Sequence, residues 1–333
     1  MKKLSAAVIG VGAMGKNHVR VYSELDGVKL AAVCDIDEDA AKKVSGMHKC
    51  PYYTDVGRML AEEDLDIASV VVPTNAHTEV ALACIKSGVN VLVEKPIADS
   101  LENARHIISA AKKHEVRLSV GHVERFNPAV VELKRRLDGG ELGRVFKIST
   151  QRVGPFPARV RDVGVVIDLA THDLDVMRYL TGSDVVRLYA ETEKHINTSH
   201  EDLLNAILKF ENNIVGTLEV NWLTPQKIRA LSIVGERGMF VVKYLTQELF
   251  FYENVDTKLR TYDYSDIMMG IAGGDVRAIR VRKIEPLKAE IASFVGCVGE
   301  NATPLVSGGD ALKALELAHR LIESSTKNKV MTL

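Results

Sequence analysis

Three groups of residues in this sequence have the types and spacing that chemistry on a small molecule requires. The first is the glycine-rich run Gly10-Val11-Gly12-Ala13-Met14-Gly15, which follows an apolar stretch and precedes a helical pattern. In such a run the first glycine permits a tight turn, the second lets a pyrophosphate approach the backbone, and the third allows close packing of helix on strand. The run therefore predicts a dinucleotide-binding turn.

Asp35 indicates which dinucleotide this turn would bind. It closes the second apolar run, 20 residues after Gly15. A carboxylate at that place accepts hydrogen bonds from the ribose hydroxyls and would repel a 2′-phosphate. We therefore expect NAD rather than NADP. The alternative is a solvated carboxylate at a strand end.

The second group is Glu94-Lys95-Pro96, which follows the apolar run of residues 89–93. A residue before proline avoids the helical region, so the Lys95 ammonium would project from a rigid turn. Open parallel sheets bind their ligands at the carboxyl edge of the strands, where this turn would lie. The alternative is an ordinary surface charge.

The third group is Asp168 and His172, which stand four residues apart in an otherwise apolar helical pattern. This spacing places the two side chains on the same side of a helix. A carboxylate can fix the tautomer of an imidazole and support its charge after the ring accepts a proton, so the pair suits proton transfer. The alternative is an ion pair on a helix surface.

The elements that position these groups follow from the periodicity of the first third of the chain. Short apolar runs alternate there with stretches of helical period, and the runs are residues 4–9, 28–34, 67–72, 89–93 and 117–120. Strands that alternate with helices predict right-handed βαβ units and a parallel, doubly wound sheet. We expect a Rossmann dinucleotide-binding domain over residues 1–121.

The rest of the chain, residues 122–333, has the pattern of a second domain of α+β class. From about Arg144 onward strand follows strand, and apolar and polar residues alternate over residues 214–222, which predicts a sheet with two unlike faces. Helical periods occur over about residues 165–180, 289–298 and 310–324. The fold class is therefore α/β, a Rossmann domain followed by an α+β domain with a large, mostly antiparallel sheet.

Composition limits the classes of partner. The 333 residues are 46% hydrophobic and 26% charged, with a formal net charge of -1, which is typical of a folded protein without a strong field for nucleic acid or anionic lipid. The four cysteines form no CxxC pair and have no neighbouring histidine at metal-ligand spacing, so we expect free, packed thiols and no metal: Cys34, Cys50, Cys84 and Cys297. A small-molecule substrate is expected.

No apolar run approaches the ~20 residues that a membrane-spanning helix needs. Lys2-Lys3 and the apolar residues after them resemble the start of a signal peptide, but the glycine-rich turn that follows explains them better. We expect a cytoplasmic protein.

Four features together resemble the glucose-fructose oxidoreductase and inositol dehydrogenase (Gfo/Idh/MocA) family. They are the Gly10 fingerprint, Pro73-Thr74-Asn75-Ala76-His77, Glu94-Lys95-Pro96, and Asp168 with His172. The likeness covers nearly the whole chain. It implies that Lys95, Asp168 and His172 are catalytic.

The resemblance also implies cofactor contacts and an assembly. The cofactor-binding residues would be Gly10, Gly12, Ala13, Met14, Gly15, Asp35, Pro73, Thr74, Asn75, His77, Glu94 and Lys95. The open face of the second domain's sheet commonly forms the subunit interface in this family. A homodimer or homotetramer is therefore expected.

Cationic residues of the second domain point to an anionic substrate. Arg159 and Arg161 would share a face of an extended segment, as would Lys227 and Arg229, and Arg152 precedes them. Such cations suit a phosphate or carboxylate, although solvated arginines are common on any surface. The expected substrate contacts are His122, Arg152, Arg159, Arg161 and Arg229.

The segments 121–127 and 151–168 look like the sugar-nucleotide branch of the family, and they are most similar to members that oxidise the 3-hydroxyl of UDP-N-acetylglucosamine to a ketone. Relatives with nearly the same motifs act on inositols, UDP-N-acetyl-glucosaminuronate or imines. A non-enzymatic NAD-bound sensor of this fold should lack the lysine and histidine, and both are present. A nucleic-acid site at Arg277, Arg280, Arg282 and Lys283 is disfavoured by the neutral net charge.

Overall fold

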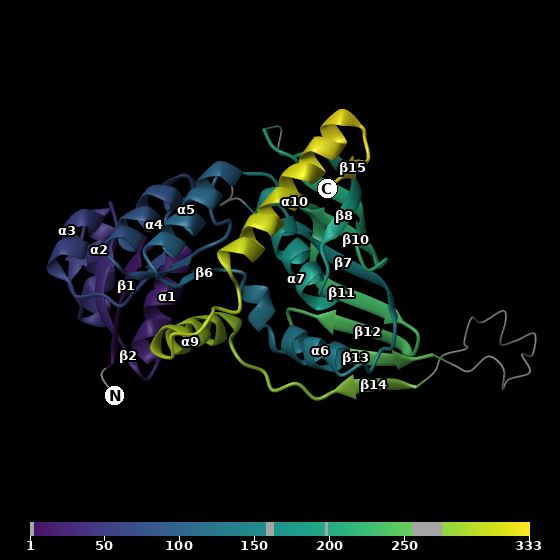
Figure 1. Ribbon diagram of the computed structural model, residues 1–333, viewed down its shortest axis with the longest axis horizontal. Coiled ribbons are helices and arrows are strands. Elements are labelled where there is room, and N and C mark those ends of the chain that lie inside the picture. The colour runs from purple at the N-terminus through teal and green to yellow at the C-terminus, as the bar shows by residue number, and fades with distance from the viewer. Residues whose placement is uncertain (1–2, 158–162, 197–198, 255–274) are drawn as a thin grey trace, which may run out of the picture. The chain divides into compact units, whose positions relative to one another are not determined.

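The computed structural model describes residues 3–157, 163–196, 199–254 and 275–333 (Figure 1). The chain divides into two compact units, and both are discontinuous in sequence. The first unit holds residues 1–126 and 285–316, and the second holds 127–284 and 317–333. The first segment thus ends close to the expected boundary at residue 121, but the expected second domain contributes a long segment to the first unit.

The described part of the first unit contains a six-stranded parallel sheet in the order β3-β2-β1-β4-β5-β6. Its strands are β1 (Leu4–Ile9), β2 (Val28–Cys34), β3 (Tyr52–Tyr53), β4 (Ile67–Val70), β5 (Asn90–Val93) and β6 (Leu118–Val120). The apolar runs of the sequence predicted five of these strands. The two-residue β3 is too short to have a period, so it was not predicted.

Helices cover the sheet of the first unit. They are α1 (Ala13–Glu24), α2 (Glu38–His48), α3 (Val56–Glu62), α4 (His77–Lys86), α5 (Leu101–Lys113) and α9 (Pro286–Gly299), with short turns η1 (Thr74–Ala76) and η2 (Val123–Phe126). The helices α1 and α9 contact each other, and Leu287, Ile291 and Phe294 of α9 share a core with Val8 and Val19. An α9 helix was predicted, but its place in the first unit was not.

The described part of the second unit contains a nine-stranded sheet in the order β14-β13-β12-β11-β7-β10-β9-β8-β15. Its strands are β7 (Val145–Pro155), β8 (Val185–Glu193), β9 (Leu203–Phe210), β10 (Val215–Asn221), β11 (Leu223–Gly235), β12 (Gly238–Lys243), β13 (Glu248–Glu253), β14 (Val276–Ile279) and β15 (Met331–Thr332). Neighbouring strands are antiparallel except β10 and β7, which are parallel. The predicted mostly antiparallel sheet is confirmed.

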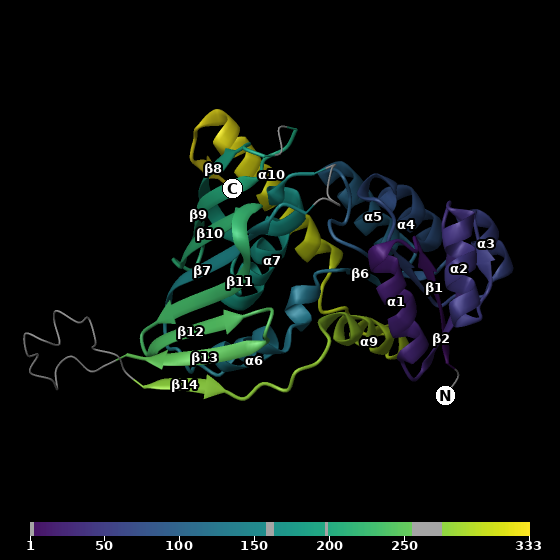
Figure 2. The ribbon, with the colours of Figure 1, turned by 180° about the vertical axis from the view of Figure 1, so that it is seen from behind.

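Helices pack against one face of this second sheet (Figures 1 and 2). They are α6 (Pro128–Asp138), the π-helical turn η3 (Val166–Ala170), α7 (Thr171–Thr181) and the last part of α10 (Gly308–Lys327). In β10, Gly216, Leu218 and Val220 are buried while Val215 is exposed, which confirms the predicted alternation. On the opposite face of the sheet, Ile207 of the neighbouring strand β9 is 58% exposed, so the described residues leave this side chain largely uncovered.

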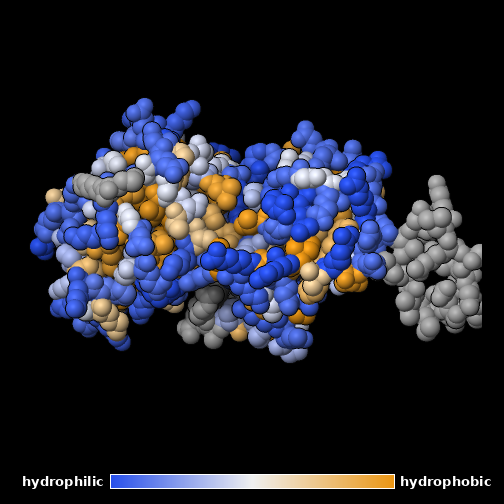
Figure 3. All heavy atoms as spheres, turned by 90° about the horizontal axis from the view of Figure 1, so that it is seen from below, coloured by the Kyte–Doolittle hydropathy of each residue, from blue (hydrophilic) through white to orange (hydrophobic). Residues whose placement is uncertain are grey.

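Hydrophilic residues cover most of the face seen in Figure 3, and hydrophobic residues gather in separate patches. None of the helices among the described residues is long and apolar enough to cross a membrane. All four cysteines are free and buried, as predicted. Burial raises the pKa of the Cys34 and Cys84 thiols to about 12.

Candidate active site

The carboxyl edge of the parallel sheet gathers the candidate residues of the first unit. Backbone hydrogen bonds continue past the strand ends, from the Gly10 nitrogen to the Cys34 oxygen (2.7 Å) and from the Glu94 nitrogen to the Val70 oxygen (2.9 Å). The Gly121 nitrogen donates to the Val93 oxygen at 2.8 Å. Gly10, Glu94 and Gly121 therefore lie along one edge, at the place where such sheets bind ligands.

The glycine turn has the geometry that a pyrophosphate requires. Gly10 has φ of 90°, and a Cβ there would lie 2.5 Å from the Val71 oxygen. A Cβ at Gly15 would lie 1.9 Å from the Gly10 oxygen, whereas one at Gly12 would have no described atom within 4 Å. Gly12 is also the N-cap of α1, so an anion can approach the first amides of that helix. These residues fit a dinucleotide.

Asp35 directly follows β2 and is hydrogen-bonded to the glycine turn. One carboxylate oxygen accepts the Val11 amide at 2.7 Å, and the other accepts the Asp37 amide at 3.0 Å. Since each carboxylate oxygen can accept more than one hydrogen bond, Asp35 keeps capacity for ribose hydroxyls. The next residue, Ile36, is 94% exposed and offers an apolar surface to an aromatic base. Sequence reasoning missed Ile36, although an apolar residue between two aspartates was a visible signal.

His77 ties together the segments that follow β4 and β5. It begins α4, after Pro73, Thr74 and Asn75, and is 1% exposed. Its ring nitrogens lie 2.9 Å from the Pro96 oxygen and 2.9 Å from the Val72 oxygen. Burial lowers the pKa of His77, although the two carbonyls oppose this effect. Both ring nitrogens of His77 are directed at backbone carbonyls, and its contact with the cofactor stays a prediction.

Lys95 follows Glu94, whose carboxylate is bound from two sides. One oxygen lies 3.0 Å from His18 Nε2, and the other accepts the Lys95 amide at 3.1 Å. His18 belongs to α1, 76 residues before Glu94, and its part in the site was not predicted. His122, an expected substrate contact, lies just after Gly121 at the same edge and is 2% exposed.

In the second unit, Asp168 and His172 lie on consecutive helical elements. Asp168 belongs to the π-helical turn η3, and His172 is the second residue of α7. The predicted helix is therefore present, but its first turn is wider than an α-helical turn, a feature frequent at functional sites.

Glu201 caps this helical segment at its N-terminal end. Its backbone oxygen accepts the Val165 amide at 3.0 Å, and its Oε1 accepts the Val166 amide at 3.2 Å. A Cβ at Gly164 would lie 2.1 Å from the same carboxylate, so the glycine leaves room for the cap. Glu201 was not predicted because it is 33 residues from Asp168 in the sequence.

Arg152 forms a buried ion pair at the start of α7. Its Nε and Nη2 donate to the Asp173 carboxylate at 2.7 and 3.1 Å, and the two side chains are 5% and 1% exposed. The guanidinium also lies 5.2 Å from the centre of the Tyr244 ring. The charge of Arg152, expected at an anionic substrate, is therefore balanced within its own unit.

The other arginines expected to contact the substrate are Arg229, Arg159 and Arg161, of which the structure describes only Arg229. Arg229 Nη1 donates to the Val153 oxygen at 2.7 Å and to the Ile228 oxygen at 2.9 Å. Arg159 and Arg161 lie outside the described residues.

Among the residues that the structure describes, no group of three or more histidine, cysteine or acidic side chains could hold a metal ion.

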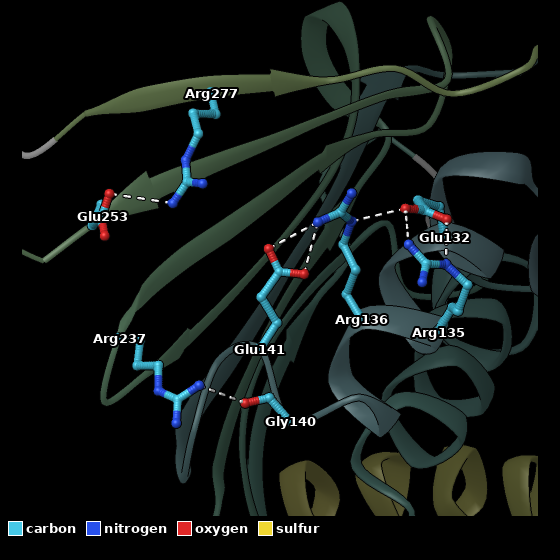
Figure 4. A network of polar contacts seen from close by, with 8 residues as sticks. All are labelled: Glu132, Arg135, Arg136, Gly140, Glu141, Arg237, Glu253 and Arg277. Carbon is cyan, nitrogen blue, oxygen red and sulfur yellow. Dashed lines mark hydrogen bonds and ion pairs between the residues drawn. The ribbon is translucent and has the colours of Figure 1, made fainter.

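Arginines of α6 and β14 form ion pairs with nearby carboxylates, in two separate groups (Figure 4). Arg136 binds Glu132 at 2.8 Å and Glu141 at 2.7 Å, and Arg277 binds Glu253 at 3.2 Å. Of the cations considered for a nucleic-acid site, Arg277 thus has a carboxylate partner. These ion pairs give no support to a nucleic-acid site.

Comparison with known proteins decides the family. A model of the GFO/IDH/MocA oxidoreductases, described as an NAD-binding Rossmann fold, matches residues 4–122, and the model of the family's C-terminal domain matches residues 130–241. The chain belongs to the GFO/IDH/MocA family. Its first unit is accordingly an NAD-binding Rossmann domain, which agrees with the cofactor that Gly10, Gly12 and Asp35 predicted.

Relatives within the GFO/IDH/MocA family differ in their substrates. The chain is 28% identical over 318 residues to a UDP-N-acetylglucosamine 3-dehydrogenase of Acidithiobacillus ferrooxidans, which covers 96% of each chain. A solved structure of that enzyme matches with a TM-score of 0.86 and 27% identity, covering 97% of this chain and 98% of the other. A myo-inositol dehydrogenase of Streptomyces leeuwenhoekii is 30% identical over 246 residues, which covers 71% of this chain and 75% of that enzyme.

Proposed function

We propose that this protein is an NAD-dependent dehydrogenase that oxidises a sugar hydroxyl to a ketone, with the 3-hydroxyl of UDP-N-acetylglucosamine as its substrate. The observation that carries the proposal is Lys95, which stands on a buried, hydrogen-bonded turn at the edge of an NAD-binding sheet. The substrate is supported by the similarity to the UDP-N-acetylglucosamine 3-dehydrogenase over 96% of both chains.

Residues of the first unit would bind the cofactor. The amides at the start of α1 and the space at Gly12 suit the pyrophosphate, and Asp35 suits the adenosine ribose. Bound NAD would supply the hydride acceptor. Thr74 and Asn75, just after β4, are proposed to complete the contacts.

The oxidation also needs a base and a cation, because removing hydride from a carbinol carbon requires that the hydroxyl proton leave. We assign the base to His172, with Asp168 supporting the charge on the imidazole. Lys95 would donate a hydrogen bond to the hydroxyl oxygen and stabilise its developing negative charge. The alternative assigns the base to Lys95, and the pH dependence of the two variants described in the Discussion separates these roles.

Two alternatives share the fold. An inositol dehydrogenase is supported by the 30% identity to the Streptomyces enzyme and by the internal pairing of Arg152, which removes one expected phosphate contact. A non-enzymatic NAD-bound sensor would need none of Lys95, Asp168 and His172, and the presence of all three favours an enzyme.

We also propose that the chain forms a homodimer or homotetramer through the open face of its nine-stranded sheet. On that face a surface hollow of about 580 Å³ is lined by residues of neighbouring strands, and Ile207 is 58% exposed. Covering this apolar side chain in an assembly would remove it from water. Ile207→Lys should therefore lower the mass measured by light scattering, and an unchanged mass would exclude this face.

A substrate panel tests the function. Purified protein is mixed with UDP-sugars, free sugars or inositols and with NAD or NADP, and the reduced cofactor is followed by absorbance. We expect UDP-N-acetylglucosamine with NAD to give the highest kcat/KM. Faster turnover of an inositol would transfer the assignment to that class, and NAD binding without any turnover would favour the sensor.

A further inference from the structure

His18 and Tyr22 occupy the core face of α1, four residues apart, and both side chains are fully buried. The Tyr22 hydroxyl lies 2.9 Å from the Ser69 hydroxyl, which explains a tyrosine in this place. His18 Nε2 instead lies 3.0 Å from Oε1 of Glu94, the residue that directly follows β5. A buried imidazole on a carboxylate is thus placed directly behind the turn that carries Lys95.

The Glu94 carboxylate is held on several sides. Its other oxygen accepts the Lys95 amide at 3.1 Å, and its side chain is 12% exposed. A Cβ at Gly121 would lie 2.8 Å from Glu94 Oε2, so the neighbouring strand end confines the carboxylate as well. The carboxylate therefore has little freedom to move, and the Lys95 amide is hydrogen-bonded to it.

The charge balance of Glu94 depends on His18. Burial by itself raises the pKa of Glu94, but the His18 hydrogen bond and charge, together with the charge of Lys95, outweigh burial and lower that pKa. The charge of Glu94 also acts on His77, whose own pKa is lowered by burial. Without His18, the ionised carboxylate would keep only the Lys95 side as compensation.

We propose that His18 is a positioning residue for Lys95 and acts through Glu94. The Nε2 proton of His18 is donated to Glu94, which keeps the carboxylate ionised and in place to accept the Lys95 amide. The start of the lysine side chain is thereby fixed relative to the sheet edge. This role rests on the proposed function of Lys95, whereas the contact between His18 and Glu94 can be tested without any turnover.

Two variants isolate the donor. In His18→Gln the amide nitrogen can take the place of Nε2 and keep a neutral donor, whereas His18→Leu removes the donor and has no group that titrates. Because neither glutamine nor leucine titrates, a pH dependence in the difference between the two variants' unfolding midpoints reports on Glu94 alone. Tyr22→Phe is the matched control, since it removes a buried hydrogen bond on the same helix face that does not reach Lys95.

The first measurement is urea unfolding at about pH 8 and about pH 5. In His18→Leu the ionised Glu94 lacks its donor, so its pKa rises and its charged form destabilises the fold. We expect the midpoint of His18→Leu to fall below that of His18→Gln, with a larger gap at the higher pH. In a Glu94→Gln background the gap should become independent of pH, and Tyr22→Phe should lose the same stability at both.

The second measurement is turnover with the best substrate of the panel. Small misplacement of a reacting group can cost on the order of 100-fold in rate. We expect kcat of His18→Leu to fall about 10- to 100-fold, with a much smaller change in the NAD dissociation constant and an acid limb displaced to higher pH. His18→Gln should recover most of kcat, and Gly121→Ala, which pushes on the same carboxylate, should resemble His18→Leu.

The outcomes separate the two proposals. Equal midpoints and equal kcat for His18→Gln and His18→Leu would overturn the role of His18. A gap that depends on pH, without any difference in kcat, would leave the contact in place but refute its effect on Lys95. If the unmodified protein turns over nothing in the panel, the proposed function fails, and the unfolding measurement still decides whether His18 holds Glu94.

Discussion

The two candidate catalytic regions are supported by groups of different chemistry. The turn of Lys95 is held by buried imidazoles, His18 at Glu94 and His77 at the Pro96 oxygen. The helix start of His172 is held by the Arg152–Asp173 ion pair and by the backbone contacts of Glu201. Histidine gains and loses its proton near neutral pH, whereas arginine keeps its charge.

This difference predicts that the support of Lys95 is more sensitive to pH than the support of His172. Protonation of His77 would change its hydrogen bonds to the carbonyls behind Lys95, whereas the Arg152 guanidinium keeps its charge over the same range. His77 also contributes to stability, because its folded pKa is lowered by burial. Its contribution is complete above the unfolded pKa of about 6.5 and is lost as the pH falls from that value through the lower folded pKa. We expect acid to loosen the lysine turn before the histidine helix.

Replacing the two reacting groups themselves should have the largest effect. We expect Lys95→Met to lose turnover while the fold and NAD binding remain, and His172→Asn to lose the acid limb, the fall in the rate of oxidation below neutrality that protonation of the base causes. Loss of a general base costs about 10²–10⁴-fold, or roughly 3–5.5 kcal/mol. Steady-state kinetics from about pH 5 to 9 measure both. If His172→Asn turns over substrate and keeps this acid limb, the base is Lys95.

The ion pair at the start of α7 gives the next largest effect. Arg152→Met should leave the buried Asp173 charge without its guanidinium and lower the free energy of unfolding by about 3–5 kcal/mol. The double variant Arg152→Met, Asp173→Leu should regain much of this loss, because it removes both charges. Urea unfolding measures these values. A single variant as stable as the parent would show that the pair is not the support of the histidine helix.

Selectivity should divide between the two units. Asp35→Ser removes the charge that would repel a 2′-phosphate, so the ratio of kcat/KM for NAD to that for NADP should fall while the substrate KM is unchanged.

Arg229→Ala should weaken the binding of a sugar nucleotide by about 1.5–3 kcal/mol and leave cofactor affinity unchanged. Isothermal titration of cofactor and substrate with both variants checks this. NADP turnover equal to NAD in the unmodified protein would contradict the role of Asp35.

The cap of Glu201 gives the smallest effect. Glu201→Ala removes the side-chain acceptor of the Val166 amide, and losing a helix cap typically costs about 1 kcal/mol. We expect a small fall in thermal stability and a larger relative fall in kcat, because the turn that holds Asp168 is released. Glu201→Gln, which keeps an acceptor oxygen, is the control. Equal kcat in both variants and the parent would remove Glu201 from the support of the site.

Local signals in the sequence were sufficient for the parallel sheet. The predicted runs 4–9 and 28–34 agree with β1 and β2 residue for residue, and the glycine spacing predicted the turn at Gly10. Both depend on contacts between residues close in sequence, where periodicity and steric demands are direct. The roles proposed for Lys95, Asp168 and His172 came from a family resemblance and remain predictions.

Long-range contacts could not be predicted in this way. His18 and Glu94, which form a hydrogen bond, are 76 positions apart in the sequence. Arg152 and Asp173, which form an ion pair, are 21 positions apart. Glu201 caps the helix at Val166, 35 positions away. No pattern of period two or 3.6 reports such distances. The sequence shows that Arg152 is a cation but cannot show its pairing with the Asp173 carboxylate, and the substrate contact of Arg152 stays a prediction.

The return of α9 to the first unit affects how the chain folds during its synthesis. Leu287, Ile291 and Phe294 fill a core that begins with Val8 and Val19, so the first unit is incomplete until residues near 300 have been made. A ribosome adds only ~5–20 residues each second, so the nascent first unit exposes part of its core for many seconds. During that interval it presents hydrophobic surface of the kind that chaperones bind.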